Sequence, residues 1–374
     1  MGTLLTAGDV YCGVGGMSLG FEQAGFDVRF GIDMDPLHVE TYSLNFPKAI
    51  TLSADVTDLS GDVIREVAGL HGRPLDVLFG GPPCQGFSII GRRQIHDPRN
   101  NQLKQFARLV FELQPRYFVV ENVEGLLRGL PRGIVAAFLS AIRTNGYVIV
   151  LPIRSLDASD FGVPQRRRRV FILGYRRGEK APAYPIPLMS ADGDVKRPTV
   201  WEFIGDLARI RNGSSPAHDV YTGRLGAASR FTLCLRGEAR DALDHSARDV
   251  ANHSGLSGCK RTRHSEAVVA RFKATRPGTY EPVSRYYRLT KDGLAPTLRS
   301  GSDEAHGSYT APRPIHPTQA RCITVREAAR LQTFPDWFQF HPTQWHGHEQ
   351  IGNAVPPRLA LFVAACVARA ADGF

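Results

Sequence analysis

The sequence lacks any pair of cysteines at the CxxC spacing that zinc sites use. In a reducing compartment, which we expect for this chain, disulfides are also disfavoured. A cysteine with a chemical role should therefore act alone. The six cysteines of the 374 residues are Cys12, Cys84, Cys234, Cys259, Cys322 and Cys366.

Targeting and membrane signals are equally scarce. Residues 1–13, MGTLLTAGDVYCG, have no basic stretch followed by an apolar core, and no apolar run is long enough to cross a bilayer. Internal repeats and low-complexity tracts are missing too. With 43% hydrophobic and 22% charged residues, the composition is that of a soluble globular protein, and the length suggests two domains. We therefore expect a cytoplasmic protein with no membrane partner.

Acidic residues are in short supply. The chain has 46 Lys and Arg against 36 Asp and Glu, a net charge of +10, and residues 251–300 hold ten basic residues against three acidic ones. A solvated loop face could have this composition, but Phe272, Tyr280, Tyr286 and Tyr287 stand among the charges. Interleaved aromatic and basic side chains favour a surface that binds phosphates and packs against sugars, so we predict a nucleic-acid partner.

Apolar runs and amphipathic stretches alternate through the first 175 residues. This alternation predicts a doubly wound α/β fold, with a mostly parallel sheet that binds ligands at the carboxyl ends of its strands. A Pro- and Gly-rich segment, 176–194, then marks the start of a second, smaller and less regular region. The predicted strands include 4–11, 27–33, 75–81, 116–122, 147–154 and 169–175.

Two helices are expected near the end of the chain. Thr324 and Glu327 have the spacing of a capping box, and Pro335 should end the helix that they begin. A second helix should follow at 355–371, with Pro357 in its first turn, where a missing N–H costs nothing. Its wide apolar face needs a partner surface, so we expect it to return to the first domain.

Residues 9–26 predict a strand, a glycine turn and a helix. Gly13, Gly15 and Gly16 would let the backbone approach a nucleotide at the helix N-terminus. The dinucleotide pattern GxGxxG needs a glycine where Ser18 stands, which argues against a nicotinamide oxidoreductase. A tight turn without a ligand is the alternative.

Acidic residues follow the next two strands. Asp33 is placed to accept hydrogen bonds from both ribose hydroxyls, Met34 can pack on an adenine, and Asp55 closes the third strand. Two acids without a basic phosphate clamp suit an adenosine that carries a cationic sulfonium better than one that carries pyrophosphate. The alternative is that both carboxylates merely cap helices.

The segment GGPPCQGFS, residues 80–88, places Cys84 after the fourth strand on a turn stiffened by two prolines. Such a turn presents the thiol rather than burying it, and nearby positive charge would give it thiolate character. Glu121 ends the next apolar strand, where its carboxylate must find water, a partner or a ligand. One crossover helix, around 102–114, bridges these strands, so both side chains should share one cleft.

Four adjacent arginines lead into the last predicted strand. Since side chains alternate along a strand, Arg167 and Arg169 should point one way and Arg166 and Arg168 the other. One pair can then line the cleft while the other meets phosphate or solvent.

In this order the motifs resemble those of the bacterial DNA cytosine-5 methyltransferases, over nearly the whole chain. The resemblance implies a catalytic and cofactor-binding domain at 1–185, a target-recognition domain and hinge at 186–339, and a C-terminal segment, 340–374, that returns to the catalytic domain. The matching segments are DVYCGVGG, GIDMDP, ADVTDL, GGPPCQGFS, ENVEGLL, QRRRRVFILGY, RCITVREAARLQTFPD and QIGNAVPPRLA.

The resemblance also assigns roles to residues. Cys84 would be the nucleophile, Glu121 the acid, and Arg167 and Arg169 the catalytic arginines of the QxRxR motif, with Arg169 at the base. S-adenosylmethionine would be the methyl donor. The residues expected to border it are Tyr11, Gly13, Gly15, Gly16, Asp33, Met34, Asp55, Pro82, Asn353 and Val355.

Double-stranded DNA is the implied substrate, bound by a monomer. Addition of the thiolate at C6 of cytosine would activate C5, and because neither C6 nor N3 is open inside a duplex, the base must be flipped into the cleft. The expected DNA-binding residues are Gln85, Ser88, Arg166, Arg168, Lys260, Arg261, Arg263, Arg285, Arg288 and Arg299.

The implied role is that of the modification enzyme in a restriction-modification system, with a restriction endonuclease acting on the same site. An RNA (tRNA) cytosine-5 methyltransferase of the same family is the alternative. An inactive DNA-binding regulator is disfavoured because Cys84 and Glu121 are both present. Arginine outnumbers lysine across 186–320, and its guanidinium matches O6 and N7 of guanine, so we predict guanine near the target cytosine.

Overall fold

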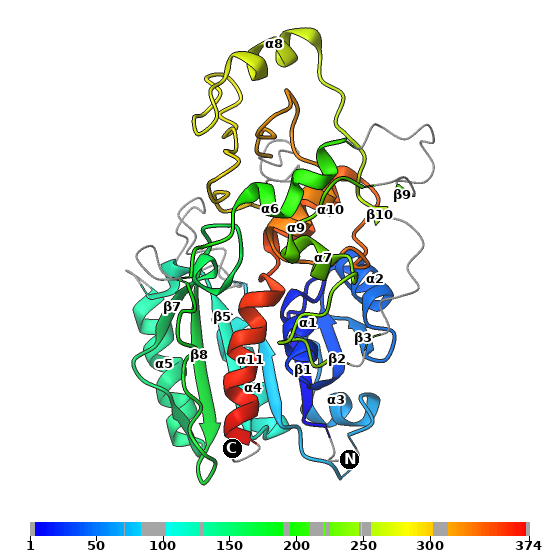
Figure 1. The fold of residues 1–374 in the computed structure, drawn as a ribbon. Helices are drawn as coiled ribbons and strands as arrows, with labels where there is room; N and C mark the ends of the chain where they lie inside the picture. Colours follow the sequence, from blue (N-terminus) through cyan, green and yellow to red (C-terminus); the bar gives the residue numbers. More distant parts are fainter. Residues whose placement is uncertain are drawn as a thin grey trace.

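The structure is a computed structural model, and the residues that it describes are 4–70, 72–83, 102–127, 131–189, 195–209, 220–221, 225–246, 248, 256–301 and 313–371. The predicted site residues Cys84, Gln85 and Ser88 lie outside the described residues. A sheet with helices on both faces forms the larger part of the molecule. A smaller, irregular part, which includes α8 (Glu266–Ala274), lies beyond the carboxyl ends of the parallel strands (Figure 1).

The strands form one sheet in the order β3-β2-β1-β4-β5-β8-β6, and β7 pairs with β8. β1 to β5 are parallel, whereas β8 runs antiparallel to β5, β6 and β7. This is the mostly parallel, doubly wound sheet that the sequence predicts. The strands are β1 (Thr6–Val10), β2 (Asp27–Asp33), β3 (Ile50–Ser53), β4 (Val77–Gly80), β5 (Tyr117–Asn122), β6 (Tyr147–Ile149), β7 (Arg154–Asp157) and β8 (Arg168–Arg176).

The predicted strand at 147–154 is divided in the structure. β6 ends at Ile149, and β7 begins at Arg154 and pairs with β8. The other strands predicted by residue range lie within two residues of the observed bounds. β4 and β5 are buried along their whole length, and strands covered on both faces have the continuous apolar runs that made them recognisable.

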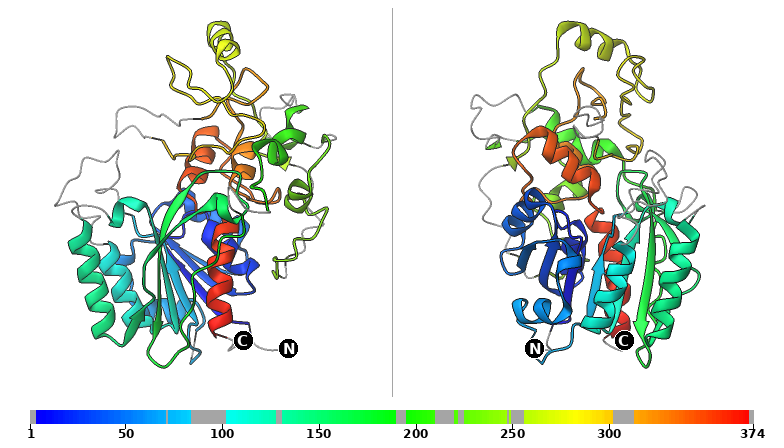
Figure 2. Two further views of the ribbon diagram at one scale, coloured as in Figure 1. Left: turned by 60° about the vertical axis from the view of Figure 1, so that its left-hand side comes forward. Right: turned by 180° about the vertical axis from the view of Figure 1, so that it is seen from behind.

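Helices cover both faces of the sheet (Figure 2). One face carries α3 (Gly61–Val67), α4 (Gln102–Leu113) and α5 (Pro131–Thr144), and the other carries α1 (Gly16–Gln23) and α11 (Pro357–Ala371). α2 (Pro36–Asn45) follows β2 and packs against it. Short 3-10 turns lie at Val56–Asp58, Glu124–Leu127, Ala158–Phe161 and Gly205–Arg209.

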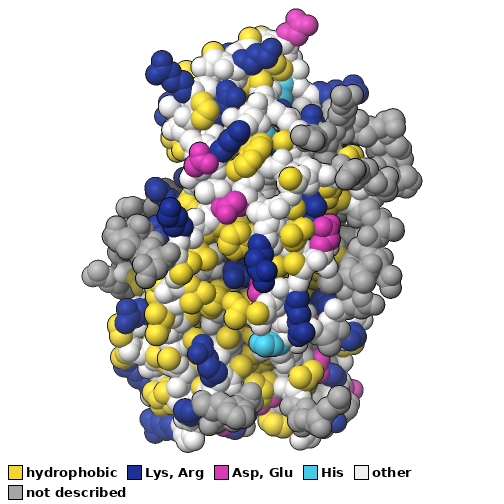
Figure 3. Space-filling view, in the orientation of Figure 1, with side chains coloured by type: hydrophobic (Ala, Val, Ile, Leu, Met, Phe, Trp, Pro, Cys, Tyr) yellow, Lys and Arg dark blue, Asp and Glu magenta, His cyan; other side chains and the backbone are white. Residues whose placement is uncertain are grey.

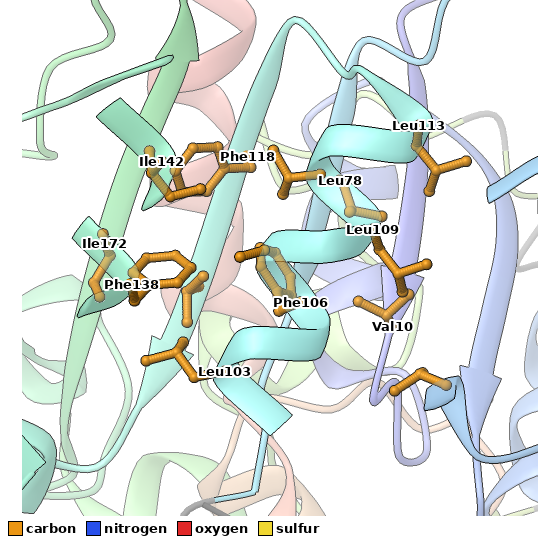
Figure 4. Close-up of a cluster of buried hydrophobic side chains, with 14 of the residues drawn as sticks. Val10, Leu78, Leu103, Phe106, Leu109, Leu113, Phe118, Phe138, Ile142 and Ile172 are labelled. Carbon is orange, nitrogen blue, oxygen red and sulfur yellow. The ribbon is translucent and has the colours of Figure 1, made fainter. Parts of the chain in front are cut away.

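The packing of α4 shows how these layers hold together. Its buried side chains include Leu103, Phe106 and Leu109, which recur at the spacing of one helical face. Figure 4 shows this face lying over the sheet, and the Phe106 and Phe118 ring centroids are 6.2 Å apart in an edge-to-face arrangement. Each buried phenylalanine contributes about 1.5–3 kcal/mol to folding.

α11 brings the C-terminal segment back to the sheet, where it packs against α1. Gly20 of α1 permits the close approach, since a Cβ there would lie 2.5 Å from the Ala360 Cβ and 2.6 Å from the Leu361 nitrogen. By length and composition the stretch Gln344–Ala371 could cross a membrane, but 67% of its apolar window is buried inside the protein. Residues 354–356 divide it into two helices, so it behaves as a core element.

The smaller part contains short helices joined by irregular segments. The predicted capping box is confirmed: Thr324 and Glu327 cap α9, although this helix ends at Leu331, before Pro335. Arg330 of α9 forms ion pairs of 2.6 Å with both Asp206 and Asp336. The elements are α6 (Val200–Ile204), α7 (Arg230–Leu235), α8, α9 (Val325–Leu331), α10 (Gln344–Asn353), β9 (Val220–Tyr221) and β10 (Leu256–Ser257).

Candidate active site

The candidate functional side chains lie where the parallel strands end. β2, β1, β4 and β5 are neighbours, so their carboxyl ends share one edge of the sheet. The predicted site residues at or just after the ends of these strands are Tyr11, Asp33, Pro82 and Glu121. Since β8 is antiparallel to β5, Arg169 near its start meets the end of β5.

Glu121 and Arg169 form an ion pair at this edge. The Arg169 Nε lies 2.9 Å from the Glu121 Oε1, and the two side chains are 14% and 11% exposed respectively. Burial raises the pKa of Glu121 above its ordinary value, while the positive charges of Arg169 and Arg167 oppose that rise. A carboxyl whose protonated form is favoured by burial is suited to hold and donate a proton.

The turn that leads to Cys84 is held by β5. The Asn122 Nδ2 donates a hydrogen bond of 2.9 Å to the Pro82 carbonyl. A Cβ on Gly81 would lie 3.0 Å from the Glu121 Oε2, so the carboxyl lies against this segment. Asn122 was not among the predicted site residues, although a polar side chain directly after Glu121 at the end of a buried strand was a signal for it.

Arg167 faces inward, as Arg169 does, but its guanidinium is bound within the protein. Its side chain is 1% exposed and donates to the carbonyls of Leu298 at 2.9 Å, Gly352 at 2.8 Å and Ala354 at 2.8 Å. Arg167 thus lies on the same inward side as Arg169, as the alternation predicts, but main-chain carbonyls occupy its guanidinium. Its contacts make Arg167 a residue that joins the sheet to two other segments.

The neighbours of Arg167 in the sequence either bond within the protein or face solvent. The Gln165 Oε1 accepts a hydrogen bond of 3.1 Å from the Leu298 N–H. Gln165, the first residue of the QxRxR motif, therefore also joins two segments, a role that was not predicted. Arg166 and Arg168 are exposed, and the Arg168 Nε lies 3.3 Å from the Glu124 Oε1. These two arginines therefore face solvent, as the alternation predicts.

At the other end of this edge, the glycine turn lies against β2. Gly13 and Gly15 have φ angles of 53° and 92°, in the left-handed region that favours glycine. The Gly13 N–H donates a hydrogen bond of 2.9 Å to the Asp33 Oδ2. A Cβ on Gly13 would meet no atom within 4 Å, so the turn borders open space beside the Asp33 carboxylate.

Asp33 is held as an ionised acceptor. Burial opposes ionisation, but the charge of His38, 3.7 Å away, and hydrogen bonds from the Asp35 and Gly13 N–H groups lower the pKa of Asp33 below its ordinary value. The N-cap of α2 is Asp35, so Asp33 is not a helix cap. Met34 beside it is 68% exposed, although it is a large apolar side chain.

Asp55 and Tyr11 have contacts within the protein. The Asp55 Oδ1 accepts a hydrogen bond of 2.9 Å from the Thr57 N–H and so caps the turn at Val56–Asp58. The alternative of a capping carboxylate therefore holds for one oxygen of Asp55. The Tyr11 hydroxyl donates to the Gln102 carbonyl at 3.0 Å, which places its ring at the start of α4.

The C-terminal segment reaches the same edge. A Cβ on Gly16 would lie 2.3 Å from the Val355 carbonyl oxygen, so Val355 passes directly over the start of α1. Asn353 is exposed and its Nδ2 donates to the Glu349 carboxylate. Ser18, which breaks the dinucleotide pattern, donates to the buried Asp9 Oδ2 at 2.6 Å and has a structural role.

The predicted DNA-binding residues of the smaller part fall into two groups. Arg288 donates to the carbonyls of Phe272 and Thr275 at 2.7 Å, and Arg261 donates to the Ala208 carbonyl at 3.2 Å, so both stabilise the fold. Figure 3 shows Lys and Arg side chains over the outer end of the molecule, in the region of α8. The predicted DNA-binding residues of the smaller part that are exposed are Lys260, Arg263, Arg285 and Arg299.

Comparison with known proteins gives consistent matches. Residues 5–368 match the sequence model of the family described as C-5 cytosine-specific DNA methylase. The chain is 44% identical to the Type II methyltransferase M.XorII of Xanthomonas oryzae pv. oryzae, over 97% of this chain and 84% of that protein. It is 32% identical to the Type II methyltransferase M1.HphI of Haemophilus parahaemolyticus, over 97% and 86% of the two chains.

A solved structure agrees with these relatives. A prophage-encoded E. coli protein, described as a DNA modification methyltransferase, superposes with a TM-score of 0.81 at 33% identity, over 98% of this chain and 99% of that one. The family match covers nearly the whole chain and includes the edge that carries Glu121 and Arg169. The chain therefore belongs to the C-5 cytosine-specific DNA methylase family and is a DNA cytosine-5 methyltransferase of the Type II restriction-modification kind.

Proposed function

We propose that the enzyme transfers a methyl group from S-adenosylmethionine to C5 of a cytosine that is flipped out of a short, specific duplex sequence. The observation that carries this proposal is the Glu121–Arg169 pair, 2.9 Å apart, against the turn that leads to Cys84. An acid and a guanidinium beside a segment that leads to a cysteine are suited to cytosine methylation, since C5 is a poor nucleophile until electron density is placed there.

The chemistry assigns a distinct task to each residue. Sγ of Cys84 adds to C6 of the flipped base while Glu121 holds a proton at N3, and the electron pair of the C5–C6 bond becomes available at C5. When bound, S-adenosylmethionine would supply a methyl group carried on its cationic sulfonium sulfur. The methyl group would be transferred to C5, and the rest of the donor would leave as a neutral thioether. The methylated C5 then loses its proton to solvent water, the C5–C6 double bond forms again, and the Sγ–C6 bond breaks to release Cys84 as a thiolate. Arg169 keeps the Glu121 carboxyl oriented through its ion pair.

The residues at the β1 and β2 ends fit this methyl donor. The Asp33 carboxylate is ionised and each of its oxygens retains a lone pair for a ribose hydroxyl. Gly13 borders open space, and the exposed Met34 offers an apolar surface for the adenine. The remaining residues expected to border the donor are Tyr11, Gly15, Gly16, Asp55, Pro82, Asn353 and Val355.

Recognition of DNA is assigned to the exposed arginines of the smaller part. A hollow of about 460 Å³ is lined by Tyr280, Glu281, Pro282, Arg285 and Arg299. Its guanidinium groups suit guanine edges or phosphates. Gln85, Ser88, Arg166, Arg168, Lys260 and Arg263 are proposed to contact the DNA as well.

The proposed setting follows from the Type II relatives. We infer a monomer that acts on double-stranded DNA in the bacterial cytoplasm, beside a restriction endonuclease for the same sequence. Residues 1–185 would form the catalytic domain, 186–339 the target-recognition domain and hinge, and 340–374 the returning segment. The alternative of an RNA substrate is tested by adding tRNA as a second substrate in the experiment below.

Trapping on 5-fluorocytosine tests the proposal. Wild-type enzyme should form a denaturation-resistant adduct with duplex DNA that carries 5-fluorocytosine, because fluorine at C5 cannot leave as a proton does. Cys84→Ser should form no adduct and transfer no tritiated methyl groups, yet bind DNA, since a hydroxyl is a much weaker nucleophile than a thiolate.

Cys234→Ser is the matched control, because Cys234 is a partly exposed cysteine in the smaller part, and it should behave as wild type. Full activity in Cys84→Ser, or an adduct mapped to another cysteine, would contradict the mechanism. Methyl transfer to tRNA in preference to DNA would move the substrate to RNA.

A further inference from the structure

One histidine outside the recognised motifs lies among three carboxylates. The His38 Nε2 is 3.1 Å from the Glu349 Oε2 and 3.9 Å from the Asp35 Oδ2, and its Nδ1 is 3.7 Å from the Asp33 Oδ1. The side chains of His38 and Asp33 are 12% and 15% exposed. The imidazole therefore lies largely out of water between Asp33 at the end of β2 and Glu349 on α10.

These neighbours keep the imidazole charged. Burial alone would lower the pKa of His38, but the negative charge of Asp33 and the hydrogen bond and charge of Glu349 raise it to about 10. A cation placed between carboxylates offsets the repulsion that they would otherwise exert on one another. Without it, three acidic side chains would converge on one partly buried position.

His38 also connects the two segments that flank the proposed donor site. Asp33 is the proposed ribose acceptor, and the Glu349 carboxylate accepts a hydrogen bond from the Asn353 side chain. The next residue of α10 reinforces the contact, because the Gln350 Nε2 donates a hydrogen bond of 2.9 Å to the Thr41 Oγ1 of α2. α2 and α10 are thus joined by two successive residues.

The bonds of Asp33 show what the contact achieves. The Oδ2 accepts the Gly13 N–H at 2.9 Å, and the Oδ1 accepts the Asp35 N–H at 2.9 Å while facing His38. The carboxylate is therefore fixed in one orientation from both sides, yet each oxygen has a lone pair left for a ligand. A group that fixes an acceptor before the ligand arrives reduces the ordering that binding must perform.

We propose that His38 is a positioning residue for the methyl donor, whose cation orients the Asp33 carboxylate toward the ribose hydroxyls and ties it to Glu349 and Asn353. This inference rests on the proposed function, which assigns the ribose to Asp33. It names a contact between α2 and α10 as part of the donor site.

Ligand binding to the DNA-free protein tests this inference. Calorimetry would compare S-adenosylhomocysteine with an analogue that lacks both ribose hydroxyls, in the wild type and in His38→Gln. The variant should bind S-adenosylhomocysteine about tenfold more weakly, the size of one charge-assisted hydrogen bond. Its affinity for the analogue should change by less than about twofold, because the analogue makes no bond to Asp33.

Matched variants separate positioning from simple support of the fold. His346→Gln, on the same helix α10, should leave both affinities unchanged. Glu349→Gln should weaken the hydroxyl-dependent affinity in the same direction as His38→Gln, and the double variant should lose less than the two single losses combined, because the residues act through one contact. A His38→Gln variant that weakens both ligands equally would reduce His38 to a structural role and overturn the inference.

Two further measurements make the outcomes distinguishable. If Asp33→Ala keeps the preference for the ligand with ribose hydroxyls, the ribose assignment of the proposed function fails. If Asp33→Ala abolishes that preference but His38→Gln retains it, only the inference about His38 fails. Nitrogen NMR of the ligand-free protein at pH 7.5 should show a protonated His38 ring, and a neutral ring would also overturn the inference.

Discussion

Replacement of Arg167 by methionine should weaken the junction between the sheet and the segments around Leu298 and Gly352. The guanidinium makes three hydrogen bonds of 2.8–2.9 Å to main-chain carbonyls, and each such bond from a charged donor contributes about 1.5–3 kcal/mol. Burial works against this sum, since it lowers the pKa of Arg167 well below its ordinary value. Methionine would leave these three buried carbonyls without their donor, at about 1–3 kcal/mol for each unsatisfied group. Because the cost of burying the guanidinium offsets part of this sum, we expect a net loss of about 3–5 kcal/mol.

Urea unfolding followed by tryptophan fluorescence would measure this loss. Trp201, Trp337 and Trp345 are the three tryptophans of the chain and lie between residues 195 and 353, so they report on the part that Arg167 holds. With a slope of about 3 kcal/mol per molar urea, the transition midpoint should fall by about 1–1.7 M. Arg166→Met, at the exposed neighbour, should change stability by less than about 0.5 kcal/mol.

The opposite pattern would refute the reasoning. If Arg167→Met unfolded at the wild-type urea concentration and yet lost methyl transfer, Arg167 would act on the base or on Glu121, and its bonds to the carbonyls would carry little free energy. A drop in midpoint with residual activity per folded molecule supports the role that its contacts indicate.

Three further predictions concern the acid, the helix contact and the target. Glu121→Gln should lower methyl transfer by about 10²–10⁴-fold but unfold at higher urea than wild type at pH 8. Because the pKa of Glu121 is raised in the folded state, its contribution to stability is present below the unfolded pKa and is lost as pH rises through the folded pKa. Glutamine does not titrate, so the variant should not show this loss. An equal difference in urea midpoint at pH 4 and pH 8 would contradict this prediction. Gly20→Ala should cost about 1–3 kcal/mol of stability through its clash with Ala360. Gly133→Ala, where a Cβ meets no atom within 4 Å, should not destabilise the protein. Equal urea midpoints for the two variants would show that the contact between α1 and α11 tolerates the added methyl group. Bisulfite sequencing of treated plasmid should find guanine near the methylated cytosine, and a consensus of A and T alone would exclude that prediction.

Much of the sheet was predictable because its signals are local. β2 was predicted at its observed bounds, and β4 and β5 are runs of buried residues that end at glycine or at a polar residue. Glu121 was recognisable because a carboxylate directly follows such a run. β7 was missed because its four residues, RSLD, have no apolar run of their own and pair only through β8.

The contacts of the site were less predictable because their partners lie far along the chain. Arg167 bonds to residues more than 130 positions away, and nothing near it in the sequence distinguishes it from Arg169. His38 faces Glu349 across 311 positions, and neither residue belongs to a motif that draws attention. Strand alternation predicted that Arg166 and Arg168 are exposed and that Arg167 and Arg169 face inward, but it could not predict the distant carbonyls that bind Arg167.

The contact between α1 and α11 has a consequence for the synthesis of this protein. α1 emerges from the ribosome early, but the helix that covers its apolar face is made only after residues 24–356 have been translated. Until then, Gly20 and the buried side chains around it have no partner on that face, and Val355 has not yet reached Gly16. A nascent or truncated chain would therefore expose this surface to chaperones, and methylation should begin only once translation is complete.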